Sequence, residues 1–245
     1  MDEQFKSDLF LSVKRNGVAR VDDPHADEAE EEFKIAKQKF FHQLDHKGGY
    51  QKRECECCGF DSKSFQHIHH KDGDHHNNKT SNFSLRCPLC HYVEHIGYEL
   101  VANNSVIIML PEISQEILNN TLIHGFCLNH LLEYNINDDH NDYESLAMMQ
   151  VQFNALYSAF EQRALKTKQF FGSSDPNFFA NRLLEMNDQD YRKRRNSAFK
   201  DLRILFKPNI FETEIKFWTN TYFDSNGSIP LKWIQECIKV KDRSV

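Results

Sequence analysis

The stretch from Cys55 to His95, CECCGFDSKSFQHIHHKDGDHHNNKTSNFSLRCPLCHYVEH, decides the fold. It holds two Cys-x-x-Cys pairs, Cys55/Cys58 and Cys87/Cys90, and each pair presents two sulfurs from one backbone loop. Four thiolates in two such pairs are typical of a closed, tetrahedral structural zinc site. Zinc binding would supply folding energy that a small polar segment cannot obtain from an apolar core. The sequence therefore predicts one structural Zn²⁺ held by these four cysteines.

Three further cysteines are assigned other places. Cys57 lies inside the first pair and could replace one of its members, but Cys57 and Cys58 are adjacent, so the spacing favours Cys55 and Cys58. Cys127 and Cys237 lie in helical patterns and are interpreted as ordinary core or surface thiols.

Histidines between and after the cysteine pairs indicate a second, separate metal centre, because a site with four thiolates is already full. Neighbouring side chains of a strand point to opposite faces, so His69 can face a metal while His70 faces an attacking water. His91 and His95 are four apart on a predicted helix, share one face, and could complete the site with His69. Mg²⁺, Mn²⁺ or Ni²⁺ are the candidate ions.

Such a centre suits the hydrolysis of a phosphodiester. A divalent metal relieves charge on the phosphate, and a histidine that does not bind metal can take a proton from water. We therefore predict His70 as the general base and Asn82 as the residue that holds the hairpin in place. The nearby Asp72, Asp74 and Asn78 are interpreted as turn formers. Three other histidines are interpreted as bystanders: His67, His75 and His76.

The composition is that of an ordinary globular chain, with 245 residues, 40% hydrophobic and 27% charged. No stretch is long and apolar enough to cross a bilayer, and the first residues do not resemble a signal peptide. Seven cysteines clustered as metal knuckles indicate a reducing compartment. We expect a cytoplasmic protein that is peripheral to the inner membrane through partners, without direct membrane insertion.

The formal net charge of −6 argues against a general nucleic-acid-coating role, which needs a basic excess. A local basic face is still conceivable at residues 192–195 together with Lys200 and Arg203, opposed by an acidic run at residues 27–32. Taken alone, each run is interpreted as a solvated helix face.

The N-terminal part is predicted to contain a hairpin and a helix. Two short strand-like runs, residues 9–14 and 18–21, flank the turn signal Arg15-Asn16-Gly17. Apolar residues at helical spacing follow, before Gly48-Gly49 ends the pattern; they are Phe33, Ala36, Phe40, Phe41 and Leu44.

From residue 111 onward the pattern is helical. Residues 105–110 form a short apolar, β-branched run ended by Pro111, which opens a helix. After a loop at residues 135–142, a long amphipathic helix carries an aromatic stripe suited to core or partner packing; its apolar positions are Leu146, Met149, Phe153, Leu156, Phe160 and Ala164. Residues 173–176 break the chain before a short helix, one or two more helices span 191–223, and residues 227–230 precede a final segment.

The metal segment resembles an HNH (ββα-metal) nuclease motif. The resemblance is carried by the His69-His70 pair, by Asn82 five residues before the second cysteine pair, and by His91 directly after it. The sequence thus predicts an α+β fold, with an HNH-like ββα-metal zinc core, an N-terminal β-hairpin and a mainly helical C-terminal half. The expected divisions are residues 1–49 for the hairpin and helix, 50–110 for the zinc-binding HNH-like core, and 111–245 for the helical extension.

A wider set of matches, in the same order along the chain, resembles the DotN (IcmJ) family of the type IVB (Dot/Icm) secretion system. The matches lie at residues 55–60, 72–74, 77–78, 81–82, 93–94, 97, 110–113 and 174–176. The resemblance implies that Cys55, Cys58, Cys87 and Cys90 are the zinc ligands. It also implies docking onto the cytoplasmic C-terminal extension of the coupling ATPase DotL, near DotM, as part of a platform that recruits effectors.

The chain departs from this family at one point. The family's nuclease site is regarded as degenerate, whereas the set formed here by His69, His70, Asn82 and His91 looks complete. Two functions therefore stay open: an adaptor subunit of the coupling complex, and a metal-dependent HNH endonuclease that acts on DNA. A transcription-type zinc ribbon would leave the helical half unexplained.

Overall fold

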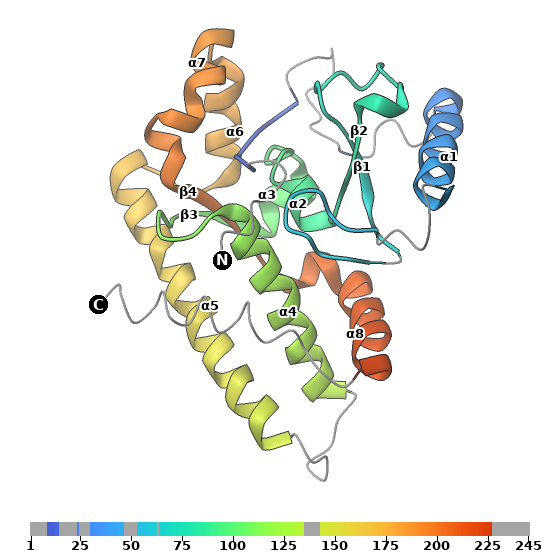
Figure 1. Cartoon of the computed structure of the whole chain (residues 1–245). Coiled ribbons are helices and arrows are strands. Elements are labelled where there is room, and N and C mark those ends of the chain that lie inside the picture. The colour runs from blue at the N-terminus through green and yellow to red at the C-terminus, as the bar shows by residue number, and fades with distance from the viewer. Residues whose placement is uncertain are drawn as a thin grey trace.

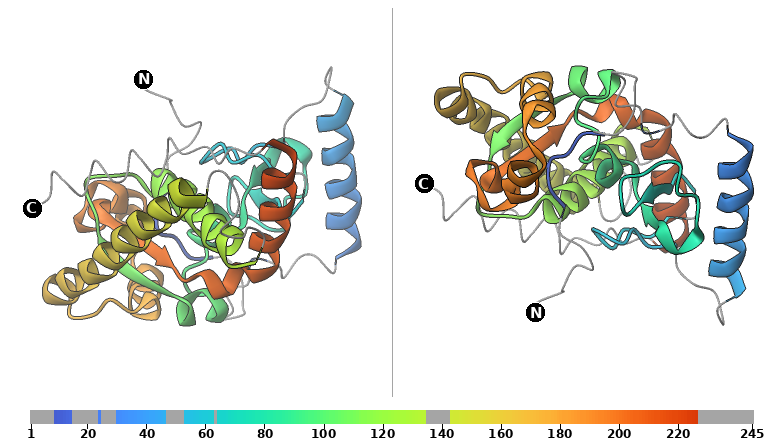
Figure 2. Two further views of the ribbon diagram at one scale, coloured as in Figure 1. Left: turned by 90° about the horizontal axis from the view of Figure 1, so that it is seen from below. Right: turned by 90° about the horizontal axis from the view of Figure 1, so that it is seen from above.

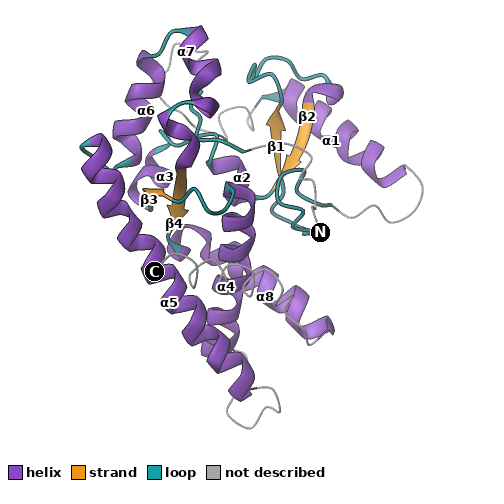
Figure 3. Cartoon of the chain, turned by 60° about the vertical axis from the view of Figure 1, so that its left-hand side comes forward, coloured by secondary structure: helices purple, strands orange, loops and turns teal. Residues whose placement is uncertain are grey.

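The structure, a computed structural model, describes residues 9–14, 24, 30–46, 53–62, 64–134 and 143–226. These residues form a mixed α and β protein that is mostly helical (Figures 1 and 3). Their strands form two small antiparallel sheets, β1 (His67–His70) with β2 (Phe83–Arg86) and β3 (Ser105–Met109) with β4 (Leu202–Phe206). The α-helices are α1 (Glu31–His46), α2 (Pro88–Tyr92), α3 (Glu99–Asn103), α4 (Gln115–Tyr134), α5 (Tyr143–Phe171), α6 (Pro176–Glu185), α7 (Asp188–Lys193) and α8 (Glu212–Asn226). None of the helices in the described ranges is long and apolar enough to span a membrane.

The predicted N-terminal helix is confirmed as α1, which lies at one side of the molecule beside the β1–β2 hairpin (Figures 1 and 2). Its helical spacing buries Phe33, Ala36 and Phe40 on one face. These side chains form a small hydrophobic cluster with residues of both strands, namely Ile68, Phe83 and Leu85. The helix therefore covers one face of the hairpin. The expected helix end at Gly48-Gly49 lies outside the described residues.

The N-terminal hairpin is not found in the part of it that the structure describes. Residues 9–14 form no strand, and their expected partners at residues 18–21 lie outside the described ranges. The backbone of Ser12 instead pairs with Val93 and Ile96, each at 3.1 Å. The alternation that suggested a strand is real, because Leu9, Leu11 and Val13 are buried together in the core. An extended segment docked on a core has the same period-2 pattern as a paired strand.

The C-terminal half is not wholly helical, because residues 202–206 form β4. This strand pairs in antiparallel register with β3, from Ser105 opposite Phe206 to Met109 opposite Leu202. Both strands are short and mostly apolar, with Arg203 as the one charged residue of β4, and periodicity alone cannot tell such a run from a buried helix segment. The sequence pattern therefore missed the second strand, which lies far along the chain from its partner.

Helices α4 and α5 complete the core behind this sheet. The predicted long amphipathic helix is confirmed as α5, whereas α4 begins at Gln115 and not at Pro111. One hydrophobic cluster draws on residues from Leu9 to Trp218 and so includes both sides of the division expected at residue 110. The expected loop at 135–142 and the segment after residue 226 lie outside the described residues.

Candidate metal centres

The structure brings together the four cysteines expected to hold zinc. Their four sulfur atoms lie within 4.8 Å of one another, and all four side chains are buried; the residues are Cys55, Cys58, Cys87 and Cys90. They are free thiols, and the Cys58 and Cys87 sulfurs are 3.7 Å apart. Cys57 is equally buried but does not belong to this group. The spacing argument in favour of the outer two cysteines thus agrees with the geometry.

Local backbone geometry forms each knuckle. In the first, the Cys55 N–H donates to Phe60 O at 2.8 Å and the Gly59 N–H donates to Cys55 O at 3.0 Å. Gly59 has φ of 72°, a left-handed conformation that favours glycine. In the second, Cys87 caps the N-terminus of α2, and its sulfur accepts a hydrogen bond from the Cys90 N–H. The hydrogen bonds of the two turns therefore direct the sulfurs toward one point.

Side chains of α4 and α8 form hydrogen bonds with residues at both cysteine pairs. The Asn119 side-chain amide donates to the Cys90 sulfur at 3.3 Å, and that of Asn120 donates to Cys58 O at 2.8 Å. From α8, the Trp218 indole N–H donates to Ser62 Oγ at 2.9 Å. Amide donors of this kind orient metal ligands and offset the charge of a thiolate. The sequence pattern does not indicate these donors, because their spacing is that of ordinary helix positions.

The electrostatics of the sulfur group fit a cation. Burial opposes ionisation of Cys55, but hydrogen bonds from Cys58, Cys87 and Cys90 outweigh it and hold its pKa well below the ordinary value. Interaction with Cys55 raises the pKa of Cys58 well above its ordinary value, and burial does the same for Cys87. A second buried thiolate is therefore unfavourable beside the first. Four thiolates need a positive ion between them, and soft thiolate donors suit a thiophilic metal.

A second group of possible metal ligands consists of His69, His91 and His95. One nitrogen from each ring lies within 4.8 Å of the others. The rings of His91 and His95 have centroids 4.9 Å apart, and those of His69 and His91 are 5.7 Å apart. The expected helix is shorter than predicted, since α2 ends at Tyr92 and tight turns then bring His95 back to the same side. Three imidazoles from a strand and a helix end could hold one divalent ion.

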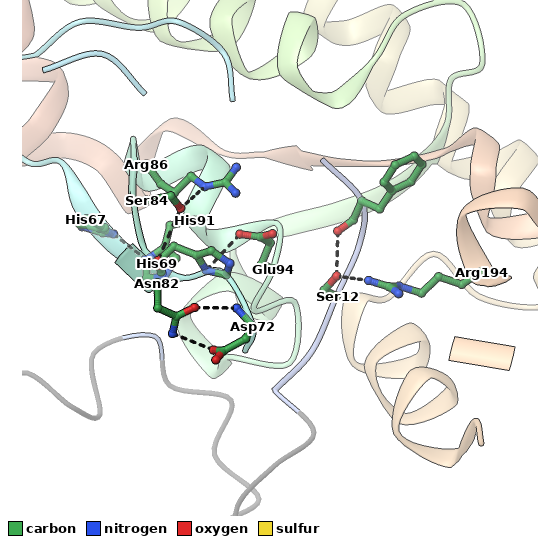
Figure 4. Close-up of polar contacts among 11 residues, drawn as sticks. Ser12, His67, His69, Asp72, Asn82, Ser84, Arg86, His91, Glu94 and Arg194 are labelled. Atoms are coloured by element: carbon green, nitrogen blue, oxygen red, sulfur yellow. Dashed lines mark hydrogen bonds and ion pairs between the residues drawn. The ribbon is translucent and has the colours of Figure 1, made fainter. Parts of the chain in front are cut away.

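The environment of His69 favours a neutral ring, the form that binds metal. Burial lowers its pKa, while the Glu94 carboxylate acts in the opposite direction. Glu94 Oε2 lies 3.2 Å from His69 Nδ1, and both side chains are largely buried (Figure 4). This pairing of a carboxylate with an imidazole is common behind the ligands of metal sites.

His70 points away from His69, as expected for neighbours in a strand, but into a packed environment. Its side chain is only 2% exposed and lies against Phe33 and Phe83. Its Nε2 is 3.1 Å from Asn78 Oδ1, so Asn78 contacts a candidate site residue and is not only a turn former. The ring of His75 lies between, with centroids 4.9 Å from His70 and 5.9 Å from His95. The role of His70 as a base stays a prediction.

Asn82 holds the connection between β1 and β2 (Figure 4). Its amide group donates to Asp72 Oδ1 at 2.8 Å and to Asn77 O at 3.0 Å, and its oxygen accepts from the Asp72 N–H. Asp72 and Asp74 act as turn formers, since each carboxylate accepts a backbone N–H two residues on. Asn82 therefore stabilises the connection between the two strands through three side-chain hydrogen bonds.

Two histidines that the sequence suggested were bystanders lie at the site. His67 Nδ1 is 3.0 Å from His91 Nδ1, and His75 lies between His70 and His95. A signal for His67 was present, because it is two residues before His69 and so shares its strand face. His75 gave no such signal, because the turn at residues 71–78 determines its direction. His76 is exposed, as a bystander would be.

Two arginines of the candidate basic face, Arg194 and Arg203, donate hydrogen bonds to the protein's own backbone. Arg194 donates to Ser12 Oγ at 2.6 Å (Figure 4). It also donates to Leu11 O at 3.1 Å and stacks on Tyr191. Arg203 donates to Ile113 O at 2.9 Å. These two side chains fasten the chain to itself and do not present a surface to phosphate.

Comparison with known proteins places these centres in context. No protein-family model matches the chain. The chain is 29% identical over 196 residues to the type 4 apparatus protein DotN of Legionella pneumophila. The alignment covers 77% of this chain and 80% of that protein, so the similarity extends well beyond the cysteine and histidine segment. The chain is therefore similar to DotN along most of its length.

Proposed function

We propose that the chain is a component of a type IV secretion apparatus, in which it acts as a zinc-containing adaptor that docks onto the C-terminal extension of a DotL-like coupling ATPase, near a DotM-like subunit. The observation that carries this proposal is the extent of the similarity to DotN, which covers about four-fifths of both chains. An adaptor also needs exposed contact surface, and α5 offers it. Four of its apolar side chains are between 66% and 69% exposed: Met148, Val151, Leu165 and Phe170.

In this proposal the metal at the four cysteines is zinc and its role is structural. A site with four thiolates has no open position for a substrate. Bound there, the ion would join the first knuckle to β2 and α2, while Asn119 and Asn120 tie the same knuckles to α4. The order β1, β2, α2 with histidines on the first strand and on the helix supports an HNH-like core. The adaptor would thus keep a nuclease-like scaffold with helices added to it.

The adaptor proposal is tested by co-expression with the cytoplasmic extension of the coupling ATPase, followed by size-exclusion chromatography and affinity measurement. A stable complex is expected. The double variant Met148→Asp and Val151→Asp is expected to weaken it at least tenfold if α5 is the contact, because charges replace exposed apolar groups. Ile35→Asp, at an exposed apolar position on α1, is the matched control and is expected to bind normally. If the wild-type chain shows no binding at micromolar concentrations, the adaptor proposal is wrong.

A second candidate function, metal-dependent cleavage of DNA, is favoured by the histidine group. His69, His91 and His95 would hold a divalent ion, which when bound supplies charge neutralisation at a phosphate. His70 would take the proton from the attacking water, and Asn78 would hold its imidazole in place. Asn82 would keep the turn between β1 and β2 in its conformation. The negative net charge and the inward direction of Arg194 and Arg203 weaken this candidate.

A nicking assay on supercoiled plasmid with Mg²⁺, Mn²⁺ or Ni²⁺ tests the nuclease candidate. His70→Ala is a poor variant for this test, because a side chain that is 2% exposed and packed against two phenylalanines leaves a cavity when removed. His70→Gln is therefore the better variant, with thermal unfolding measured alongside. Nicking that needs the metal and is lost in both His70→Gln and His91→Ala would establish an enzyme. Equal activity in wild type and variants would show a contaminating nuclease.

A further inference from the structure

Behind the histidine group lie two side chains that contact its candidate ligands from outside, Glu94 and His67. Glu94 Oε2 is 3.2 Å from His69 Nδ1, and His67 Nδ1 is 3.0 Å from His91 Nδ1 (Figure 4). In both rings the same atom, Nδ1, faces a protein partner. We infer that Glu94 and His67 are positioning residues that fix the tautomers of His69 and His91, so that each ring presents Nε2 to a divalent cation. This inference rests on the histidine metal centre proposed above.

The Glu94 contact favours one tautomer of His69. Glu94 Oε2 is buried, lies 3.2 Å from His69 Nδ1, and meets no donor at hydrogen-bond geometry among the described residues. A small rotation of the His69 ring would bring an Nδ1 hydrogen onto this oxygen and leave the lone pair on Nε2 for a cation. The two side chains are 13% and 18% exposed, so water competes little for this position. A buried carboxylate also raises the basicity of the imidazole it contacts, which strengthens metal binding.

The His67 contact specifies the second proton. Of two neutral imidazoles that meet through Nδ1, one must donate and the other accept. If His91 binds a cation through Nε2, its Nδ1 carries the hydrogen and His67 accepts it. Strand geometry places His67 for this role, because His67 and His69 lie on the same face of β1, opposite Arg86 and Ser84 of β2 in the strand register.

The two contacts also connect β1 with α2 and the residues that follow it. β1 has four residues and α2 has five. Glu94 follows α2 and reaches back to β1, while His67 reaches from β1 to α2. Each partner therefore ties one element to the other through a candidate ligand.

Isothermal titration of Mn²⁺ into the full chain tests the inference, with zinc content measured first to show that the cysteine site is still loaded. Loss of an outer partner typically costs 10- to 100-fold in metal affinity. We expect that loss for His67→Ala and for Glu94→Ala. His67→Asn keeps an acceptor at the position of Nδ1 and is expected to restore affinity to within about threefold of wild type. His76→Ala removes an exposed histidine nearby and serves as the control.

The possible outcomes distinguish a failure of the positioning inference from a failure of the proposed histidine metal centre. If His69→Ala and His91→Ala bind Mn²⁺ as tightly as wild type, the histidine metal centre itself is wrong. If those variants lose binding but His67→Ala and Glu94→Ala stay within twofold of wild type, the centre stands and the positioning inference fails. Thermal unfolding in the absence of Mn²⁺ is the second readout. A purely structural role would lower the melting temperature of His67→Ala, and His67→Asn would not restore the affinity.

Discussion

Cys58 and Cys127 show how far one residue type can differ between two buried places in the same chain. Cys58 faces three other sulfurs, whereas Cys127 lies on α4 beside Thr219, and burial raises its pKa to about 12. Cys58→Ser is therefore expected to abolish stoichiometric zinc binding and to unfold the knuckles, since a structural zinc is worth on the order of 10 kcal/mol to a small domain. Cys127→Ser is expected to keep one zinc per chain. Elemental analysis and thermal unfolding check both, and a zinc-free but fully stable Cys58→Ser protein would contradict the structural role.

His124 offers a prediction about pH. Burial lowers its pKa, and a bond to Asn120 O only partly opposes this shift, so the folded chain binds this proton less tightly than the unfolded chain. The stability that the neutral ring contributes is present above the ordinary histidine value, near 6.5, and decreases as the pH falls below it. One proton corresponds to about 1.4 kcal/mol per pH unit. His124→Gln should therefore flatten the dependence of unfolding free energy on pH between 5.5 and 7.5, measured against wild type. Parallel curves for the two proteins would contradict this assignment.

Helices α4 and α5 are in close contact at Gly125, where α4 has no side chain. An added Cβ on Gly125 would overlap the ring of Phe153, which is 2% exposed and cannot move aside. Alanine is the better helix former by about 1 kcal/mol, but overpacking a core costs about 1 to 3 kcal/mol. Gly125→Ala is thus expected to lower the melting temperature by several degrees, contrary to helix propensity. Phe153→Leu should recover part of that loss in the double variant, and strictly additive effects would show that the two positions do not meet.

The elements that the sequence predicted well are those with a clear period or a rigid motif. The apolar spacing of α1 and α5 identified both helices, and the two Cys-x-x-Cys turns identified the sulfur group. The misses have physical causes. Residues 202–206 are apolar except for Arg203, and so short a run has no period that distinguishes a strand from a helix. The pairing of β4 with β3 also joins residues about a hundred positions apart. His67 and Glu94 reach the site through contacts between elements, which spacing along one element cannot show.

Across the whole molecule, α2 joins the two candidate centres. Cys87 caps this helix, Cys90 and His91 lie in it, and Asn119 of α4 contacts the Cys90 sulfur. Displacement of the sulfurs would therefore move His91 as well. We expect that removal of zinc by a strong chelator abolishes Mn²⁺ binding at the histidines, while His91→Ala leaves zinc bound. Unchanged Mn²⁺ affinity in zinc-free protein that is still folded would show that the two centres are independent.

The segment at residues 9–14 packs against residues that are far along the chain, and Arg194 is one of the side chains that hold it, together with Tyr191 and Glu116. The guanidinium donates to Leu11 O, Ser12 Oγ and Tyr191 O, and it is 8% exposed. Without it, the Leu11 carbonyl would lose its buried donor, and a broken buried network of this kind costs about 2 to 4 kcal/mol. Arg194→Ala is therefore expected to lower the unfolding free energy by that amount in denaturant titrations. Arg192→Ala, at an exposed position on α7, should change it by less than about 0.5 kcal/mol. Equal effects of the two substitutions would mean that the basic run contributes only surface charge, and that the other contacts of the N-terminal segment, such as those of Tyr191 with Val13, hold it in place.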